Sequence, residues 1–310
     1  MSVASDKRYM GRIELVELLK SRGMIIDDDE AAHHALTHIG FHRLRAYWIP
    51  LVDDPSTKRF RPRTTFGDVL RLYEFDRRLR ILFVEAIEAI EISFRATMSR
   101  EYARSHQPNG YVSEAGASNR ERWTSAMNQL KAELGKVTAA AHGGRADNQV
   151  SELPPIWTTF EMLSFGSLSY WFSHVLPPEV RQRVARCYHV HQEVLTSWLH
   201  HLSVVRNIVA HHGRLWNRRA LFLPKIPKRH DLQKSLAPGS VGLYNTCVIL
   251  QYLLDQIQPD NSWRDRLYNL ICSYEVDHTL LGFPDDWRNR DIWRCAFAFD
   301  PLSRSKREGV

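Results

Sequence analysis

One segment of the chain gathers the residues that could bind or cut a phosphodiester. Residues 206–230, RNIVAHHGRLWNRRALFLPKIPKRH, contain seven lysines or arginines and no aspartate or glutamate. The formal net charge of the whole chain is +7, so positive and negative side chains cancel outside this window. Clustered cations of this kind bind phosphate backbones with release of counterions. The window therefore predicts a polyanionic partner.

Arg206 opens the window and is the first candidate for chemistry. If residues 191–212 form a helix, Arg206 lies about 20° from Leu195, in the middle of an apolar face. A guanidinium is costly to bury there, because it cannot lose its proton and must find acceptors. Two interpretations stay open. Either Arg206 pairs with a buried carboxylate, for which Glu88 and Glu91 are candidates, or the face opens onto a cleft or a second subunit where Arg206 meets phosphate.

Two histidines follow Arg206 on the same predicted helix. His211 lies about 140° round the helix from Arg206, and His212 about 120° in the opposite sense. One straight helix does not bring these groups together, unless it ends or distorts at Gly213 or a twofold-related copy supplies the opposing half. Cleavage of RNA by its 2′-hydroxyl needs a base, an acid and positive charge on the phosphorane. Two copies in a symmetric dimer supply all three, and such dimers are common, so we expect a homodimer.

Helices are expected to position these residues. Apolar side chains recur at helical spacing and no strand-type alternation persists, which predicts an all-α fold. The longest helix has Thr65 as its expected N-cap and is apolar on most sides, so other helices should nearly surround it. Helices are predicted over residues 11–22, 67–105, 119–141, 156–175, 178–188, 191–212, 241–257 and 261–275. The predicted organisation is a helical lead-in over residues 1–62, a core over 63–280 and an irregular tail over 281–310.

The residues around Arg206 also carry a family resemblance. RNIVAHHGRLWNRR resembles the signature of Abi-like proteins of the AbiD and AbiF type, which belong to the HEPN superfamily. The R-N-x-x-x-H element falls on Arg206, Asn207 and His211, and a following R-L-W-N begins at Arg214. A bare R-x-x-x-x-H is frequent by chance, but this extension and three further segments in the expected order make the match specific. The resemblance spans roughly residues 10 to 257.

The resemblance implies a fold, an activity and partners. It implies a HEPN-type helical bundle, here with a small N-terminal helical extension and extra C-terminal helices, that typically forms a homodimer. Active members cut RNA without a metal or other cofactor, and the family acts in phage defence, sometimes as a toxin held by an RNA or protein antitoxin. We therefore expect a metal-independent endoribonuclease with RNA as its substrate. The alternative is a HEPN module that binds RNA or regulates without cutting it.

Roles for the site residues follow from this expectation. His211 would act as general base or acid and Arg206 would stabilise the phosphorane, while Asn207 orients the pair. His212 stays an alternative to His211, because it lies nearer the apolar face. The RNA backbone and bases would be held by Arg214, Trp216, Asn217, Arg218, Arg219 and Lys225. Trp216 suits base stacking, although the burial usual for a large aromatic would instead make it an anchor of the loop.

Two carboxylates on the long helix have a structural and a functional interpretation. Glu91 stands four residues before Arg95, which favours an ion pair within the bundle. A supporting role for Glu88 and Glu91, in which they orient Arg206, is the other possibility.

A metal site and a membrane location find little support in the sequence. His34 and His38 have a spacing that can bind zinc, but no third ligand stands nearby, so structural histidines are expected. The four cysteines form no C-x-x-C pair and are expected to be reduced thiols. The N-terminal residues lack an uninterrupted apolar core and every apolar stretch is broken by charge, so we expect a cytoplasmic protein without a membrane span.

Overall fold

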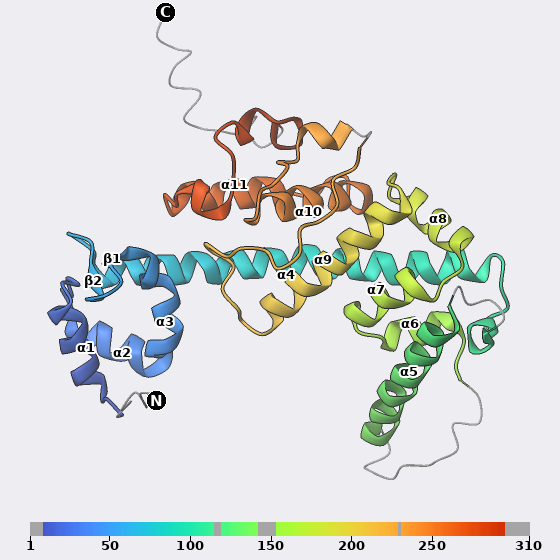
Figure 1. Ribbon diagram of the computed structural model, residues 1–310, viewed down its shortest axis with the longest axis horizontal. Helices are drawn as coiled ribbons and strands as arrows, with labels where there is room; N and C mark the ends of the chain where they lie inside the picture. The colour runs from blue at the N-terminus through green and yellow to red at the C-terminus, as the bar shows by residue number, and fades with distance from the viewer. Residues whose placement is uncertain (1–8, 115–118, 142–152, 229–230, 295–310) are drawn as a thin grey trace, which may run out of the picture. The chain divides into compact units, whose positions relative to one another are not determined.

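The computed structural model describes residues 9–114, 119–141, 153–228 and 231–294 (Figure 1). Within these ranges the chain forms α-helices, short 3₁₀-helices and one small sheet, so the all-α prediction is confirmed. The chain divides into two compact units. The first contains residues 1–79 and 270–276, and the second contains residues 80–269 and 277–310. This division differs from the predicted boundaries after residues 62 and 280.

The first unit is a small helical body with a hairpin. Its helices are α1 (Arg12–Ser21), α2 (Asp29–His38) and α3 (Phe41–Trp48), followed by a 3₁₀ turn over Ile49–Leu51. Strands β1 (Val52–Asp54) and β2 (Arg59–Phe60) pair antiparallel, which the sequence did not predict. The phenol of Tyr47 donates a hydrogen bond of 2.7 Å to the buried carboxylate of Asp76, which fixes α3 against the first turns of the next helix.

Helix α4 (Phe66–Ala103) is the long helix predicted from the sequence. The hydroxyl of Thr65 accepts from the backbone N–H of Asp68 at 3.0 Å, and the Asp68 carboxylate accepts from the Thr65 N–H at 3.1 Å. These bonds satisfy two of the donors that a helix start leaves open, so the predicted N-cap is confirmed. The expectation that other helices nearly surround α4 is wrong on one side, because Ile81, Val84 and Ile92 are about half exposed.

The second unit holds the remaining helices. They are α5 (Arg120–Ala141), α6 (Ile156–Met162), α7 (Phe165–His174), α8 (Pro178–Cys187), α9 (Gln192–Ala210), α10 (Tyr244–Ile257) and α11 (Trp263–Ser273), whose last turns belong to the first unit. Helix α9 packs against α7 and α8, and α5 packs against α7. The predicted helix over residues 156–175 is two helices, because the Ser164 hydroxyl accepts from the Ser167 N–H and starts α7.

The segment after α11 contributes to the core of the second unit. It forms 3₁₀ turns over His278–Leu281 and Trp287–Asn289, and the rings of Trp287 and Trp293 are buried. The centroid of the Phe283 ring lies 5.1 Å from that of Trp287 and 6.0 Å from that of Trp293. The predicted tail over residues 281–310 therefore begins as packed structure up to residue 294, and residues 295–310 lie outside the described residues. Among the helices described, none has the length and apolar character that crossing a bilayer requires.

Candidate functional site

Arg206 reaches from α9 towards Glu91 on α4. Its Nε lies 3.8 Å from Glu91 Oε2, and its side chain is 42% exposed. This distance is an ion pair but too long for a hydrogen bond. The guanidinium therefore has a carboxylate neighbour and still presents N–H donors to solvent.

Glu91 is itself held in place by Arg95, one turn further along α4. The Arg95 Nη2 donates to the other oxygen of Glu91, and Nη1 donates to the backbone carbonyls of Phe160 at 2.5 Å and Glu161 at 2.9 Å. The Glu91 side chain is only 12% exposed. The predicted ion pair between Glu91 and Arg95 is confirmed, and it gives Arg206 an immobile negative neighbour on one side.

A cavity of about 480 Å³ opens beside this pair. Its walls combine apolar side chains with four charged ones, and the charged ones are Glu88, Glu91, Arg95 and Arg206. Glu88 is exposed and makes no ion pair with any described residue. The two interpretations of Arg206 therefore hold together, because the guanidinium both neighbours a carboxylate and faces a cavity.

Helix α9 ends just before the two histidines. His211 is the C-cap, and His212 takes a left-handed conformation with φ of 56°. The N–H of His212 donates to the Val209 carbonyl at 3.1 Å and that of Gly213 to the Ile208 carbonyl at 2.7 Å, which is the Schellman pattern. The predicted helix over residues 191–212 is therefore shorter, and the distortion considered at Gly213 begins one residue earlier.

The histidines do not share the cavity with Arg206 in a single chain. His211, His212 and Asn207 are exposed, and none of them lines the cavity. The side chains of His211 and Asn207 make no hydrogen bond with the described residues, so both are available to a ligand or a second chain. One chain therefore supplies an arginine at a cavity and a histidine at the adjacent helix end, but not one closed site.

The structure corrects the prediction that Trp216, in the loop after α9, stacks on RNA bases. This indole is 1% exposed, so it offers no face to a base and instead anchors the loop in the core. The Arg214 guanidinium lies 5.9 Å from the centroid of the Trp216 ring, and Arg214 Nη2 donates to the Asn217 carbonyl at 3.5 Å. Asn217 has a φ of 50°, a left-handed conformation that shapes the turn, and it is half-buried.

The remaining predicted RNA contacts differ in how far they are already engaged. Arg219 is exposed and makes no hydrogen bond or ion pair with the described residues, whereas Arg218 Nη1 donates to the Arg214 carbonyl at 3.4 Å. Lys225 Nζ lies 2.5 Å from Glu193 Oε2 and holds the pKa of that carboxyl below its usual range. Lys225 therefore carries less free charge than the sequence suggested.

A buried histidine of α9, His201, fixes this loop to α9 and α10. His201 Nδ1 lies 2.8 Å from the Phe222 carbonyl, which only accepts, so this nitrogen carries the proton. Its Nε2 then accepts from the Thr246 hydroxyl at 2.8 Å, and burial lowers the pKa of the imidazole. The rings of His34 and His38 lie 4.5 Å apart, and among the described residues no third His, Cys, Asp or Glu joins a metal-binding group.

The part of the sequence that contains this site matches one protein family. The model of the Abi-like protein family matches residues 34–217, more than half of the chain. The chain belongs to the Abi-like family. The match covers α4, α9 and the turn through Asn217, so it contains the cavity and both histidines. No curated protein matches the chain, and no solved structure does.

Membership of the Abi-like family indicates a role in abortive infection, a form of defence against phage. The residues that the sequence analysis missed are those that shape the cavity rather than those that would do chemistry. Val84 and Ile92 line it from α4, and their exposure depends on which side of α4 other helices cover. Helical spacing marks them as apolar but does not reveal that the other described residues leave them about half exposed.

Proposed function

We propose that this Abi-like protein is a metal-independent endoribonuclease of the HEPN type that cuts RNA during abortive infection. The observation that carries the proposal is Arg206, which is half exposed at a cavity while the buried Glu91 steadies it. A guanidinium in this setting suits the charge that develops on a phosphorane. The histidine that would move a proton stands exposed at the end of the same helix.

The exposed side of α4 supports a homodimer. Ile81, Val84 and Ile92 recur at helical spacing and are about half exposed, and the last two line the cavity. Apolar side chains grouped in this way around a charged centre are typical of protein interfaces. A twofold-related copy on this face would bring two Arg206 and two His211 side chains to one place.

The reaction then follows from the residues of two chains. One His211 takes the proton from the ribose 2′-hydroxyl, whose oxygen forms a bond to phosphorus as the bond to the 5′-oxygen breaks. The partner's His211 gives a proton to the leaving 5′-oxygen, and Arg206 stabilises the pentacoordinate phosphorus. Asn207 orients the reacting groups, while Arg214, Arg218 and Arg219 hold the backbone. The products carry 2′,3′-cyclic phosphate and 5′-hydroxyl ends.

Cleavage of RNA in a chelator tests the activity. Purified protein is incubated with total RNA in EDTA and the new ends are mapped, beside the variants Arg206→Ala, His211→Ala and His212→Ala. Cyclic phosphate ends that disappear in Arg206→Ala and His211→Ala support the proposal. Arg120→Ala is a matched control, because this arginine is 80% exposed and its ion pair among the described residues is with Glu114. Cleavage that EDTA abolishes, or that leaves 3′-hydroxyl ends, would exclude this mechanism.

The dimer is tested separately by charge on the apolar face. Ile92→Lys should yield a monomer by light scattering and lose cleavage, because the partner's residues no longer arrive. Ile13→Lys, on an equally exposed isoleucine of the first unit, should change neither property. A wild-type protein that is monomeric and active would contradict the shared site.

A non-catalytic RNA-binding module is the second candidate. Within one chain the histidines lie outside the cavity, whereas Arg206 and Arg219 keep donors for phosphate. RNA that is retained tightly without any cut in the presence or absence of metal would favour this module. Under either function, an RNA or protein antitoxin would act by covering Arg206 and the loop after α9.

A further inference from the structure

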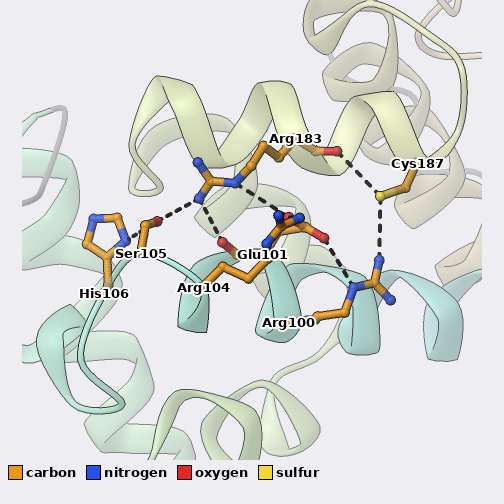
Figure 2. Close-up of polar contacts among 7 residues, drawn as sticks. All are labelled: Arg100, Glu101, Arg104, Ser105, His106, Arg183 and Cys187. Carbon is orange, nitrogen blue, oxygen red and sulfur yellow. Dashed lines mark hydrogen bonds and ion pairs between the residues drawn. The ribbon is translucent and has the colours of Figure 1, made fainter.

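A second group of cations lies outside the basic window, where α4 ends beside α8. Figure 2 shows Arg100 from α4, Arg104 from the turn just after α4 and Arg183 from α8 gathered around the carboxylate of Glu101. The Glu101 side chain is 4% exposed, while Arg100 and Arg104 are each more than half exposed. The charges on these arginines therefore lie at the surface above a buried acid.

Hydrogen bonds and ion pairs hold the arginines in fixed places. Arg100 Nε donates to Glu101 Oε1 at 3.1 Å and Arg104 Nη1 to Oε2 at 3.1 Å, while Arg183 Nε lies 3.4 Å from Oε2. Arg183 Nη2 also donates to the Glu101 carbonyl at 2.8 Å and to the Ser105 hydroxyl at 2.6 Å. Guanidinium groups that are already immobilised lose little conformational entropy when they bind a further anion.

The group carries an unbalanced charge. Burial raises the pKa of Glu101, but the hydrogen bond from Arg100 and the charge of Arg104 outweigh it, so the pKa lies below its ordinary value and the acid is ionised at neutral pH. Three guanidinium groups against one carboxylate leave a net charge of +2 (3 − 1). No other carboxylate among the described residues pairs with these arginines.

The group also has more donors than acceptors. Each guanidinium carries about five N–H donors. The acceptors that meet the three arginines are the two carboxylate oxygens and the carbonyl of Glu101, the Ser105 hydroxyl and the sulfur of Cys187. Arg100 Nη2 donates to Cys187 Sγ at 3.5 Å, although a thiol sulfur is a weak acceptor. An oxyanion would be a better acceptor for this donor.

This group is distinct from the candidate site. Arg100 follows Glu91 by nine residues on α4, which places it about 14 Å along the helix and about 180° round it. It therefore faces away from the cavity at Arg206, and an RNA phosphate bound at the cavity does not reach it directly.

We propose that Arg100, Arg104 and Arg183 form a binding site for a phosphate monoester group. A monoester carries a charge of about −1.5 to −2 and three acceptor oxygens, which matches a net charge of +2 with surplus donors. A backbone phosphodiester carries a single charge and leaves half of that excess uncompensated. The monoester is supplied either by a free nucleotide or by the phosphorylated end of an RNA.

Binding of matched phosphate compounds by the full chain tests the site. Titration calorimetry with adenosine 5′-monophosphate is compared with a dinucleotide that has only a diester, and a 5′-phosphorylated RNA with the same RNA bearing a 5′-hydroxyl. Preference for the monoester in either pair supports the site. Binding of the nucleotide identifies a free ligand as the source, and binding of the RNA end alone identifies RNA. Equal affinity for monoester and diester in both pairs, or no binding, overturns the proposal.

Variants locate the binding on the protein. Arg100→Gln combined with Arg104→Gln reduces the net charge of the group to zero, and we expect affinity for the monoester to fall roughly a hundredfold, about tenfold for each charged donor lost. Arg120→Gln removes an exposed arginine elsewhere, whose side chain is 80% exposed, and should leave affinity unchanged. An equal loss of affinity in Arg120→Gln would show that the effect depends only on the net charge of the protein, and it would overturn the proposed site.

Protection of a neighbouring thiol gives a readout that needs no variant. Cys187 and Cys272 are both exposed thiols, but only Cys187 touches the arginines. Saturating adenosine 5′-monophosphate, or the 5′-phosphorylated RNA, should slow alkylation of Cys187 at least several-fold and leave Cys272 unchanged, as followed by peptide mass mapping. Unchanged alkylation of Cys187 under a ligand that binds would place that ligand elsewhere and refute the assignment.

Discussion

Replacing Glu91 by glutamine should separate the stability of the second unit from its affinity for RNA. The Glu91 carboxylate is nearly buried and joins Arg95 to Arg206. Removing one partner of a buried ion pair costs about 3–5 kcal/mol. The glutamine oxygen still accepts a hydrogen bond from Arg95, and Arg95 keeps its hydrogen bonds to the carbonyls of Phe160 and Glu161. We therefore expect the free energy of unfolding to fall by about 2–3 kcal/mol. For a unit of this size that lowers the Tm by roughly 4–12 °C.

The same replacement, Glu91→Gln, should raise the affinity for RNA. The contact between Arg206 and Glu91 spans 3.8 Å at a side chain that is 42% exposed, so solvent screens it and it contributes less than about 1 kcal/mol. Without the Glu91 carboxylate, the positive charge of Arg206 is no longer partly compensated. The affinity for RNA should therefore rise roughly two- to fivefold. The rate of cleavage should nevertheless fall, because Arg206 is no longer steadied.

Glu88→Gln is the matched control for this prediction. Glu88 lies one turn earlier on α4 and lines the same cavity, but it is exposed and makes no ion pair with the described residues. Its replacement removes the same charge from the cavity and should raise RNA affinity without lowering the Tm. Thermal unfolding and fluorescence anisotropy with labelled RNA measure the two effects. Equal Tm values for the two variants would refute the view that Glu91 is a buried anchor.

Three further predictions concern the end of α9 and its loop. Gly213→Ala should lower the Tm by a few degrees, because an added Cβ would lie 2.9 Å from Ile208 Cγ2 and 3.0 Å from the Ile208 carbonyl oxygen. Trp216→Phe should destabilise the protein by about 1–3 kcal/mol in denaturant titrations, yet leave the affinity of the folded protein for RNA unchanged, because the indole is a buried anchor. Burial lowers the pKa of His201, so the unfolded chain takes up its proton first and stability should fall as the pH drops below about 6.5; His201→Gln should flatten that part of the curve of Tm against pH.

Periodicity predicted the long elements of the fold, and local chemistry explains the short ones it missed. Helices α4 and α9 differ from the predicted ranges by only one or two residues at each end. Strands β1 and β2 have three residues and two, too few for an alternating pattern to be visible. The break between α6 and α7 depends on the hydroxyl of Ser164, a single capping bond within an otherwise apolar run.

The candidate site could be predicted only in part, for a similar reason. The helical rotation per residue along α9 correctly predicted that Arg206 lies on the face that meets α4. The spacing of four residues on α4 correctly predicted the ion pair between Glu91 and Arg95. Rotation failed beyond Ala210, because the left-handed backbone of His212 ends the helix. Whether Trp216 was buried or exposed depended on contacts with residues far away in the sequence, which no local pattern encodes.

The incompleteness of the site in one chain is itself informative about the mechanism. Arg206 is kept from full neutralisation because its Nε lies 3.8 Å from one oxygen of Glu91 while Arg95 binds the other, and the Schellman turn holds His211 at the surface at the end of α9. A general acid and base need opposite sides of the scissile phosphate, which one exposed imidazole cannot occupy at once. Within the described part of the chain, Val84 and Ile92 on the exposed apolar side of α4 line the same cavity, so this surface adjoins the site where the proposed reaction needs a second histidine. Under the proposed function, a second copy of the chain would cover that surface and supply that histidine.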